Sequence, residues 1–140
     1  MSATKKKDGF SAEEKAAMRA RAKELKAAAD GEEAVTAALA KMAPADRAIG
    51  KRIHELVKAA APDLTPKTWY GMPAYANTDG KVVVYFRDAG KFKERYSQLG
   101  FNETANLDQG SMWPIAYALP ELTKSDEAKI TTLVKKAVRS

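Results

Sequence analysis

Thr68-Trp69-Tyr70-Gly71-Met72-Pro73-Ala74-Tyr75 is the stretch of this chain on which its fold depends. It gathers three aromatic rings, a methionine, a glycine and a proline, and helical sequence patterns lie before and after it. Gly71 can adopt a positive φ or let another group approach closely, and Pro73 fixes its own φ. We therefore expect the chain to bend here, with a trans peptide bond before Pro73.

The side chains of this stretch allow two interpretations. Rings around such a bend cannot all point into one core, so some would line a concave surface, with a Tyr hydroxyl or a lysine as the polar group. Alternatively, the rings fill the interface between a sheet and helices. The candidate ligand-binding residues are Trp69, Tyr70, Met72, Pro73, Tyr75, Tyr85, Lys91 and Trp113.

The residues that follow predict an antiparallel sheet. Lys81–Arg87 has the strongest strand propensity, and because both its faces are apolar it should be central. Asn77–Gly80 is hairpin-turn sequence that joins this strand to Ala74–Ala76. Phe92–Gly100 fits a helix or a strand, and the short loops favour a strand. Trp113–Leu119 is the last expected strand, with its proline at the start or on an edge.

The N-terminal third predicts two helices with a break between them. Ser11-Ala12-Glu13-Glu14 is a capping box, and strong helix formers continue to Ala29. We expect Asp30-Gly31 to end this helix, and a short amphipathic helix to follow as far as Ala43-Pro44. The apolar stripe of the first helix is thin, so the helix should lie at the periphery or against a partner.

Two further helices should pack on the sheet. One runs from about Ala45 to Ala60, before Pro62, and the other is capped by Thr123-Lys124-Ser125-Asp126. The single histidine, His54, lies beside the apolar stripe of the first of these helices. We interpret it as a partly exposed surface residue rather than a metal ligand or a catalytic base.

This order of elements predicts an α+β fold. We expect a two-layer structure in which an antiparallel meander sheet of about 4–5 strands packs against helices, with an added N-terminal helix. Residues 1–10 should form a disordered tail, residues 11–43 an N-terminal helical extension, and residues 44–140 the α+β domain.

Composition excludes several classes of chemistry. The 140 residues contain no cysteine and one histidine, so disulfides, thiolate metal sites and cysteine nucleophiles are absent. We find no phosphate-binding glycine loop, zinc-protease motif, calcium loop or serine-hydrolase elbow, and we expect neither a resident metal nor an enzyme. No apolar run approaches the roughly 18–20 residues that span a bilayer, and no signal peptide follows the N-terminal lysines, so we expect a cytoplasmic protein without a membrane partner.

The charge of the chain does not predict a nucleic-acid partner. The net charge is +6. Residues 1–65 carry 13 basic and 10 acidic groups and residues 66–140 carry 11 and 8, so each half has a net charge of +3. Evenly mixed charges are typical of a soluble surface. The expected partner is an unknown small molecule or protein, and the expected state is a monomer or weak dimer.

The stretch Trp69–Tyr75, followed by the strand Val82–Phe86, resembles the YdhG-like family of small bacterial domains. The end of the helix before Pro62 and the closing helix around Leu133–Ala137 also fit, so the resemblance covers about residues 45–138. It implies a compact α+β fold with an antiparallel sheet against helices. Some family members are described as frataxin-like iron chaperones, so the resemblance also implies iron as a possible cargo. Only the Trp69–Tyr75 motif carries over, and no catalytic role comes with it.

These observations rank three functions. The first is a small cytoplasmic binding module that holds a small, partly apolar ligand, or a partner's side chain, beside Trp69–Tyr75. The second is a frataxin-like iron-binding chaperone, which the family resemblance implies. The third is an enzyme of unknown reaction, for which the composition offers no general base with a tuned pKa.

Overall fold

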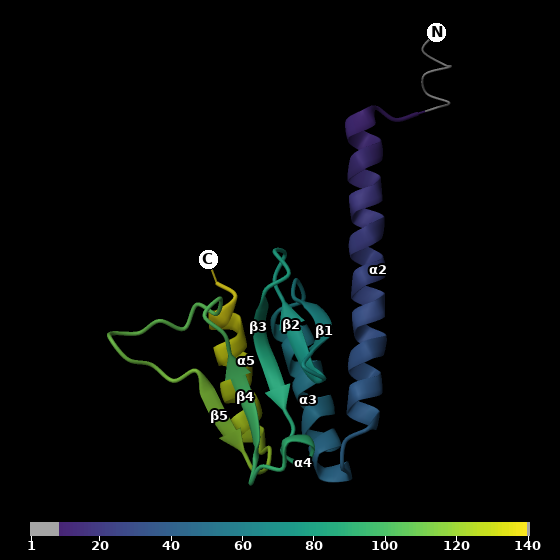
Figure 1. The fold of residues 1–140 in the computed structure, drawn as a ribbon. Coiled ribbons are helices and arrows are strands. Elements are labelled where there is room, and N and C mark those ends of the chain that lie inside the picture. Colours follow the sequence, from purple (N-terminus) through teal and green to yellow (C-terminus); the bar gives the residue numbers. More distant parts are fainter. Residues whose placement is uncertain (1–8, 140) are drawn as a thin grey trace.

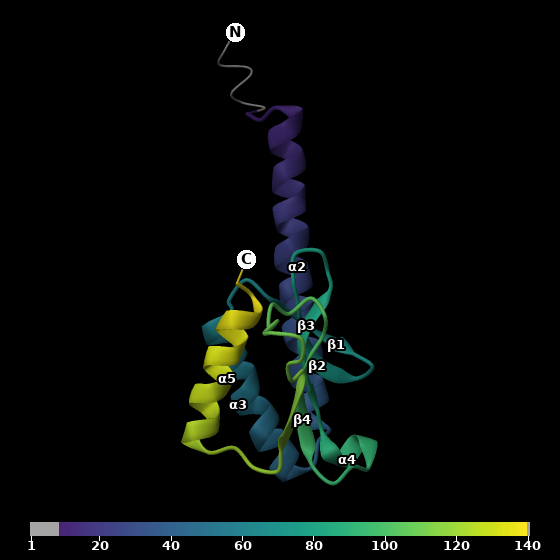
Figure 2. The ribbon, with the colours of Figure 1, turned by 90° about the vertical axis from the view of Figure 1, so that its left-hand side faces the viewer.

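The computed structural model describes residues 9–139 and arranges them in two layers (Figure 1). One layer is an antiparallel sheet whose strands lie side by side in chain order. Two helices cover one face of this sheet, and a third, long helix runs along its first edge (Figure 2). The strands are β1 (Thr65–Trp69), β2 (Met72–Ala76), β3 (Val82–Arg87), β4 (Ser97–Phe101) and β5 (Ala116–Leu119). The helices are α2 (Ala12–Ala40) at the edge, α3 (Pro44–Ala60) and α5 (Lys124–Ala137) on the face, and the short α4 (Ala89–Phe92) between β3 and β4.

This arrangement is the predicted α+β fold, a five-stranded antiparallel meander against helices with an added N-terminal helix. β3 is the middle strand, as its two apolar faces predicted. Val84 pairs with Tyr75, whereas Val82 pairs with Ala76, so Val83 is an extra residue in a β-bulge. As a result, Val83 and Val84 both belong to the hydrophobic core.

The stretch that bends the chain is a tight hairpin. β1 and β2 are joined by Tyr70 and Gly71, whose φ angles are 51° and 76°. Two consecutive positive φ angles are typical of the two-residue turns that match the twist of a hairpin. Trp69 pairs with Met72 across this turn.

Pro73 is tolerated within β2 because of its register. It pairs with Thr68, one position beyond the pair that closes the turn. In an antiparallel pair the hydrogen-bonded and non-hydrogen-bonded positions alternate, so the nitrogen of Pro73 faces away from β1, toward the β3 side, where the pairing of β2 begins only at Ala74 with Tyr85. The peptide bond before Pro73 is trans, as expected.

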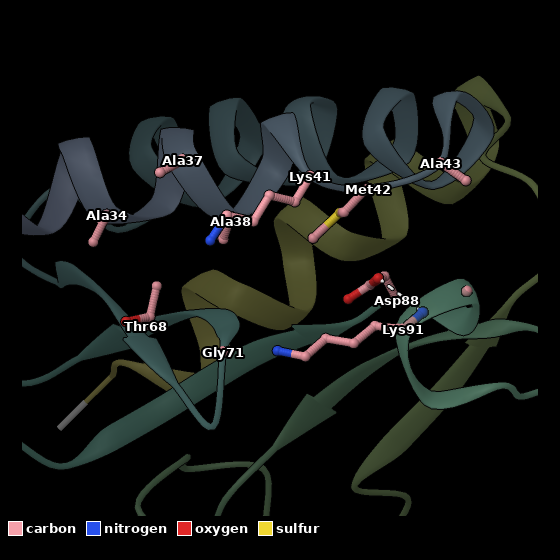
Figure 3. Close-up of a pocket in the computed structure, with 11 residues that line it drawn as sticks. Ala34, Ala37, Ala38, Lys41, Met42, Ala43, Thr68, Gly71, Asp88 and Lys91 are labelled. Atoms are coloured by element: carbon pink, nitrogen blue, oxygen red, sulfur yellow. Dashed lines mark hydrogen bonds between the residues drawn. The ribbon is translucent and has the colours of Figure 1, made fainter.

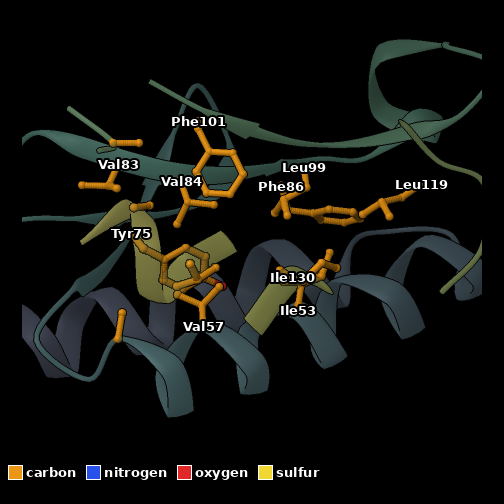
Figure 4. Close-up of a cluster of buried hydrophobic side chains, with 14 of the residues drawn as sticks. Ile53, Val57, Tyr75, Val83, Val84, Phe86, Leu99, Phe101, Leu119 and Ile130 are labelled. Carbon is orange, nitrogen blue, oxygen red and sulfur yellow. The ribbon is translucent and has the colours of Figure 1, made fainter. Parts of the chain in front are cut away.

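The core lies between the sheet and its helices (Figure 4). Each fully buried aliphatic or aromatic side chain contributes roughly 1.5–3 kcal/mol relative to exposure. The large buried residues include Tyr75, Val84, Phe86, Leu99 and Phe101 from the sheet, Ile53 and Val57 from α3, Ile130 and Val134 from α5, and Val35 and Leu39 from α2.

The expected break at Asp30-Gly31 is wrong, because α2 continues without interruption from Ala12 to Ala40. Gly31 is buried where the helix meets β1, and an added Cβ there would overlap the carbonyl group of Pro66. The glycine therefore permits a close approach of helix and strand rather than ending the helix. The second expected helix is the C-terminal part of α2.

Two predicted helix starts are confirmed. Ser11 with Glu14, and Thr123 with Asp126, form capping boxes at α2 and α5. Pro44, where the second helix was expected to end, is instead the first residue of α3. Its missing N–H costs no hydrogen bond at this position.

The two halves of α2 differ in their surroundings. Residues 12–27 are exposed along the whole helix surface and project beyond the sheet (Figure 1). Further on, Gly31, Val35 and Leu39 are buried against the sheet edge. The extension expected for residues 11–43 is therefore partly built into the core. Of the tail expected at residues 1–10, residues 1–8 lie outside the described part of the chain.

The segments expected as the last two strands are shorter than predicted. Phe92 ends α4, and β4 begins only at Ser97. Asp88 caps α4 by accepting a hydrogen bond from the backbone N–H of Lys91, and a positive φ of 54° at Lys93 closes the turn. β5 begins at Ala116, after the tryptophan and proline that were expected to open it. Among the described helices, none has the length and hydropathy needed to cross a bilayer.

Candidate functional site

A groove of about 770 Å³ lies between α2, the β1–β2 turn and α4 (Figure 3). This volume is within the range of small-molecule sites. We call it the α2–turn groove; it is lined by Ala34, Ala37, Ala38, Lys41, Met42, Ala43, Thr68, Gly71, Asp88, Gly90 and Lys91.

The wall formed by α2 and the residues after it is mainly apolar. Figure 3 shows Ala34, Ala37 and Ala38 along one side of the groove, with the thioether of Met42 directed into it. Alanine side chains are short, so they leave room beside the helix, and methionine adapts its shape to an apolar group. The side chain of Lys41 runs along this wall, with its amino group over the groove.

The opposite wall presents the amino group of Lys91. Its Nζ donates a hydrogen bond to the carbonyl oxygen of Tyr70, at 3.2 Å, in the hairpin turn. An added Cβ at Gly71 would overlap this Nζ atom. The position of the amino group therefore depends on the absence of a side chain at Gly71. In residues 9–139, neither Lys41 nor Lys91 lies within ion-pair distance of a carboxylate.

Asp88 lies between the two walls and is 2% exposed. Its Oδ2 accepts a hydrogen bond from the backbone N–H of Lys91, at 3.3 Å. Its Oδ1 has no hydrogen-bond partner within the described residues. Figure 3 shows the carboxylate directed toward the space between Met42 and Lys91.

A second carboxylate fixes α4 in place. Asp46 of α3 accepts hydrogen bonds from the backbone N–H of Gly90, at 3.0 Å, and from the hydroxyl of Ser97, at 3.3 Å. The same Ser97 oxygen accepts from the N–H of Ala89, at 3.0 Å. These bonds tie α4 to α3 and β4, so the two groove residues that α4 supplies are held by rigid elements.

Three of the predicted site residues are in the protein interior. Met72, Pro73 and Tyr75 are buried, and Tyr75 is part of the core against α3. Of these three, Tyr75 alone belongs to the hydrophobic cluster between the sheet and the helices, as the alternative interpretation expected for some of the rings.

Three others lie on the sheet face that no helix covers. The ring centroids of Trp69 and Tyr85 are 5.3 Å apart, and that of Tyr70 is 5.0 Å from Trp69. An added Cβ at Gly100, which pairs with Tyr85, would overlap the Tyr85 ring. The ring therefore lies across the glycine, while Tyr70, at the turn, is 78% exposed.

The last two lie apart from each other. Trp113 lines a separate hollow of about 460 Å³ with Phe101 and Leu107, at the β4–β5 end of the sheet. Lys91 borders the α2–turn groove, together with Thr68 and Gly71 of the opening stretch. The eight predicted residues thus occupy the core, the open sheet face and three different hollows, the third of which is bordered by Trp69.

Sequence reasoning missed Lys41, Met42 and Asp88. The turn sequence Asp88-Ala89-Gly90 carried one usable signal, because aspartate is a preferred N-cap residue. Nothing in the local pattern placed the end of α2 beside that turn.

His54 is more constrained than the surface residue we expected. Its side chain is 15% exposed, its Nδ1 lies 2.8 Å from the hydroxyl of Tyr75, and its Nε2 lies 2.6 Å from Oε1 of Glu32. Lys58 donates to the other oxygen of Glu32, at 2.8 Å. This polar chain joins α2, α3 and β2 beneath the sheet.

The chain of contacts shifts the pKa of its acidic members. Burial opposes the ionisation of Glu32, but the hydrogen bonds and charges of Lys58 and His54 outweigh it, so the pKa of Glu32 is below its usual value. Burial, with a smaller contribution from the charge of Glu32, raises the pKa of Tyr75 far above its usual range. The hydroxyl of Tyr75 is therefore a neutral hydrogen-bonding group.

Within residues 9–139 there is no group of three or more His, Cys, Asp and Glu side chains placed to hold a metal ion. Comparison of the chain with protein-family models, with curated proteins and with solved structures finds no match. The resemblance to the YdhG-like family, and the iron cargo that it implies, stay predictions.

Proposed function

We propose that this protein is a binding module that holds a small, partly apolar anion, of the carboxylic acid class, in the α2–turn groove. The observation that carries the proposal is the presence of two amino groups, those of Lys41 and Lys91, on opposite walls of one groove without a carboxylate partner in the described chain.

The apolar part of such a ligand fits the wall formed by α2. The side chains of Ala34, Ala37, Ala38 and Met42 offer it van der Waals contact, and each CH₂ group removed from water contributes about 0.8 kcal/mol. The groove is open to solvent at the exposed lysines, so a ligand can enter without a large rearrangement.

The anionic part fits between the two lysines. A hydrogen bond between an ammonium group and a carboxylate is about twice as strong as one between neutral groups. Lys91 is already held by its bond to the Tyr70 carbonyl, so it loses little further freedom on binding. Three ionisable residues line the groove: Lys41, Asp88 and Lys91. They include no nucleophile paired with a general base, so we propose binding rather than catalysis.

The proposal is tested by calorimetric titration with 4-methylpentanoate and with the neutral 4-methylpentanamide. We expect the acid to bind and the amide to bind at least about tenfold more weakly, which corresponds to about 1.4 kcal/mol. Lys41→Gln and Lys91→Gln should each weaken binding of the acid by a similar factor.

The matched control is Lys67→Gln, which removes the same charge from β1 but outside the groove. It should leave the affinity within about twofold. Equal affinities for acid and amide, or an equal loss in all three variants, would contradict the proposal. Circular dichroism of each variant establishes that its fold is retained.

A further inference from the structure

One carboxylate oxygen in the α2–turn groove has no hydrogen-bond partner in the described part of the free protein. The Oδ1 atom of Asp88 is buried without a hydrogen-bond partner; among residues 9–139 it shares this state only with Nε of Arg47. Leaving a buried polar group unpaired destabilises the fold, and more so when the group is charged. Such a group in a folded protein calls for an explanation, and a ligand that supplies the missing donor is one.

Two cationic side chains beside the groove, those of Arg47 and Lys91, do not pair with this oxygen. Nη2 of Arg47 donates to the carbonyl oxygen of Met42, at 3.1 Å, and Arg47 forms no ion pair with Asp88. Nζ of Lys91 points toward the hairpin turn, where it donates to Tyr70. The oxygen therefore has no donor within the described chain.

The direction of Asp88 makes it a ligand-facing group. Its carboxylate borders the groove and is directed between Met42 and Lys91 (Figure 3). The backbone N–H of Lys91 holds the other oxygen, so the carboxylate has a fixed orientation. A protonated nitrogen is the strongest partner for such a group, because a charge-assisted hydrogen bond in a desolvated site also removes the cost of the unpaired charge.

We infer that the ligand of the α2–turn groove is a zwitterion of the α-amino acid class with an apolar side chain. Its ammonium group binds Oδ1 of Asp88, its carboxylate binds Lys41 and Lys91, and its side chain lies along the alanines of α2. The inference rests on the proposed function, since it adds a second recognised charge to the same site.

The test compares amino acids with analogues that lack the amino group, by calorimetric titration of the full chain. The pairs are leucine with 4-methylpentanoate, methionine with 4-(methylthio)butanoate, and phenylalanine with 3-phenylpropanoate. In at least one pair we expect the amino acid to bind about tenfold more tightly or better. N-acetylation of that amino acid should remove the gain.

The decisive variant is Asp88→Asn. Asparagine remains a good N-cap residue, so α4 should be preserved. We expect the gain from the amino group to be lost, whereas the affinity for the des-amino acid should not decrease, because the variant removes a negative charge near its carboxylate. Asp108→Asn, an exposed position outside the groove, is the matched control and should change neither affinity. If Asp88→Asn lowers the thermal stability, Asp88→Ser provides a second capping residue without the amide.

The outcomes distinguish the zwitterion inference from the proposed anion-binding function. If both members of every pair bind equally, or if the gain survives in Asp88→Asn, the zwitterion is ruled out and the anion-binding function stands. If no carboxylate binds in any pair, both proposals fall. A gain that is lost in Asp88→Asn and kept in Asp108→Asn supports the inference.

Discussion

The Nδ1 atom of His54 lies 2.8 Å from the hydroxyl oxygen of Tyr75, so a histidine at the rim of α3 reaches the most deeply buried tyrosine of the sheet. Its other ring nitrogen faces the carboxylate of Glu32. An ionised carboxylate only accepts, so a neutral His54 ring carries its proton on Nε2, and its Nδ1 accepts from Tyr75. The contact gives the buried hydroxyl its hydrogen-bond partner.

The first prediction concerns this pair. His54→Ala leaves the Tyr75 hydroxyl unpaired in the core and should lower the free energy of unfolding by about 1–3 kcal/mol. Tyr75→Phe removes the hydroxyl itself and should cost about 1 kcal/mol. Because the hydroxyl is absent in the double variant, its total cost should be smaller than the sum of the two by about 1 kcal/mol. Urea denaturation of the four proteins measures this difference; strictly additive costs would show that the contact contributes nothing.

The second prediction concerns acid stability. The pKa of Glu32 in the folded protein is below 4.5, its reference value, so ionisation of this carboxyl stabilises the fold. The contribution is fully present above the unfolded pKa and is lost as the pH falls through the lower, folded pKa. We expect the free energy of unfolding to decrease as the pH drops below about 5.

The control for this effect is Glu32→Gln. This variant should be less stable than the original protein at pH 7, and the difference between the two proteins should shrink as the pH falls below 4.5. Denaturation curves at several pH values measure both slopes. A constant difference from pH 7 to pH 3 would mean that Glu32 does not titrate with folding.

The third prediction reverses a common rule. Replacing glycine with alanine inside a helix usually stabilises by up to about 1 kcal/mol. At Gly31 the new methyl group would overlap the backbone carbonyl of Pro66, which cannot move aside like a side chain. We expect Gly31→Ala to destabilise the protein by about 1–3 kcal/mol by forcing α2 away from β1. Ala20→Gly, in the exposed half of α2, should cost about 1 kcal/mol for the ordinary reason. A more stable Gly31→Ala variant would show that helix and strand separate easily.

The same glycine shows where the sequence could and could not predict the fold. Capping boxes, the apolar strand Val82–Arg87 and the hairpin turn before it depend on neighbouring residues, and the structure confirms all three. Asp30-Gly31 carries the local signal of a helix end, but the contact that decides its conformation is with Pro66, 35 positions from Gly31. A rule that considers only neighbouring residues cannot predict this long-range contact.

The candidate site was predictable to a similar extent. Gly71 was expected to adopt a positive φ or to let another group approach closely, and the structure shows both, since its φ is 76° and the Nζ atom of Lys91 lies where a side chain would be. Lys91 was among the predicted residues, and it borders the groove together with Gly71. Lys41 and Asp88 could not be found, because they border the same groove only when α2 continues through Gly31 and its end lies near α4. The aromatic residues of the stretch indicated the position of the hairpin, but none of them lines the groove beside it.

The last prediction concerns the projecting half of α2. Residues 12–27 are exposed on every side, so they contribute little packing energy to the fold. Deleting residues 1–22 should therefore change the free energy of unfolding by less than about 0.5 kcal/mol, whereas Leu39→Ala, in the buried half of the same helix, should cost about 2–5 kcal/mol. Urea denaturation measures both values, and light scattering on the shortened and full chains compares their oligomeric state. A loss above about 2 kcal/mol on deletion, especially one that grows with protein concentration, would mean that this half of the helix packs against a second copy of the chain.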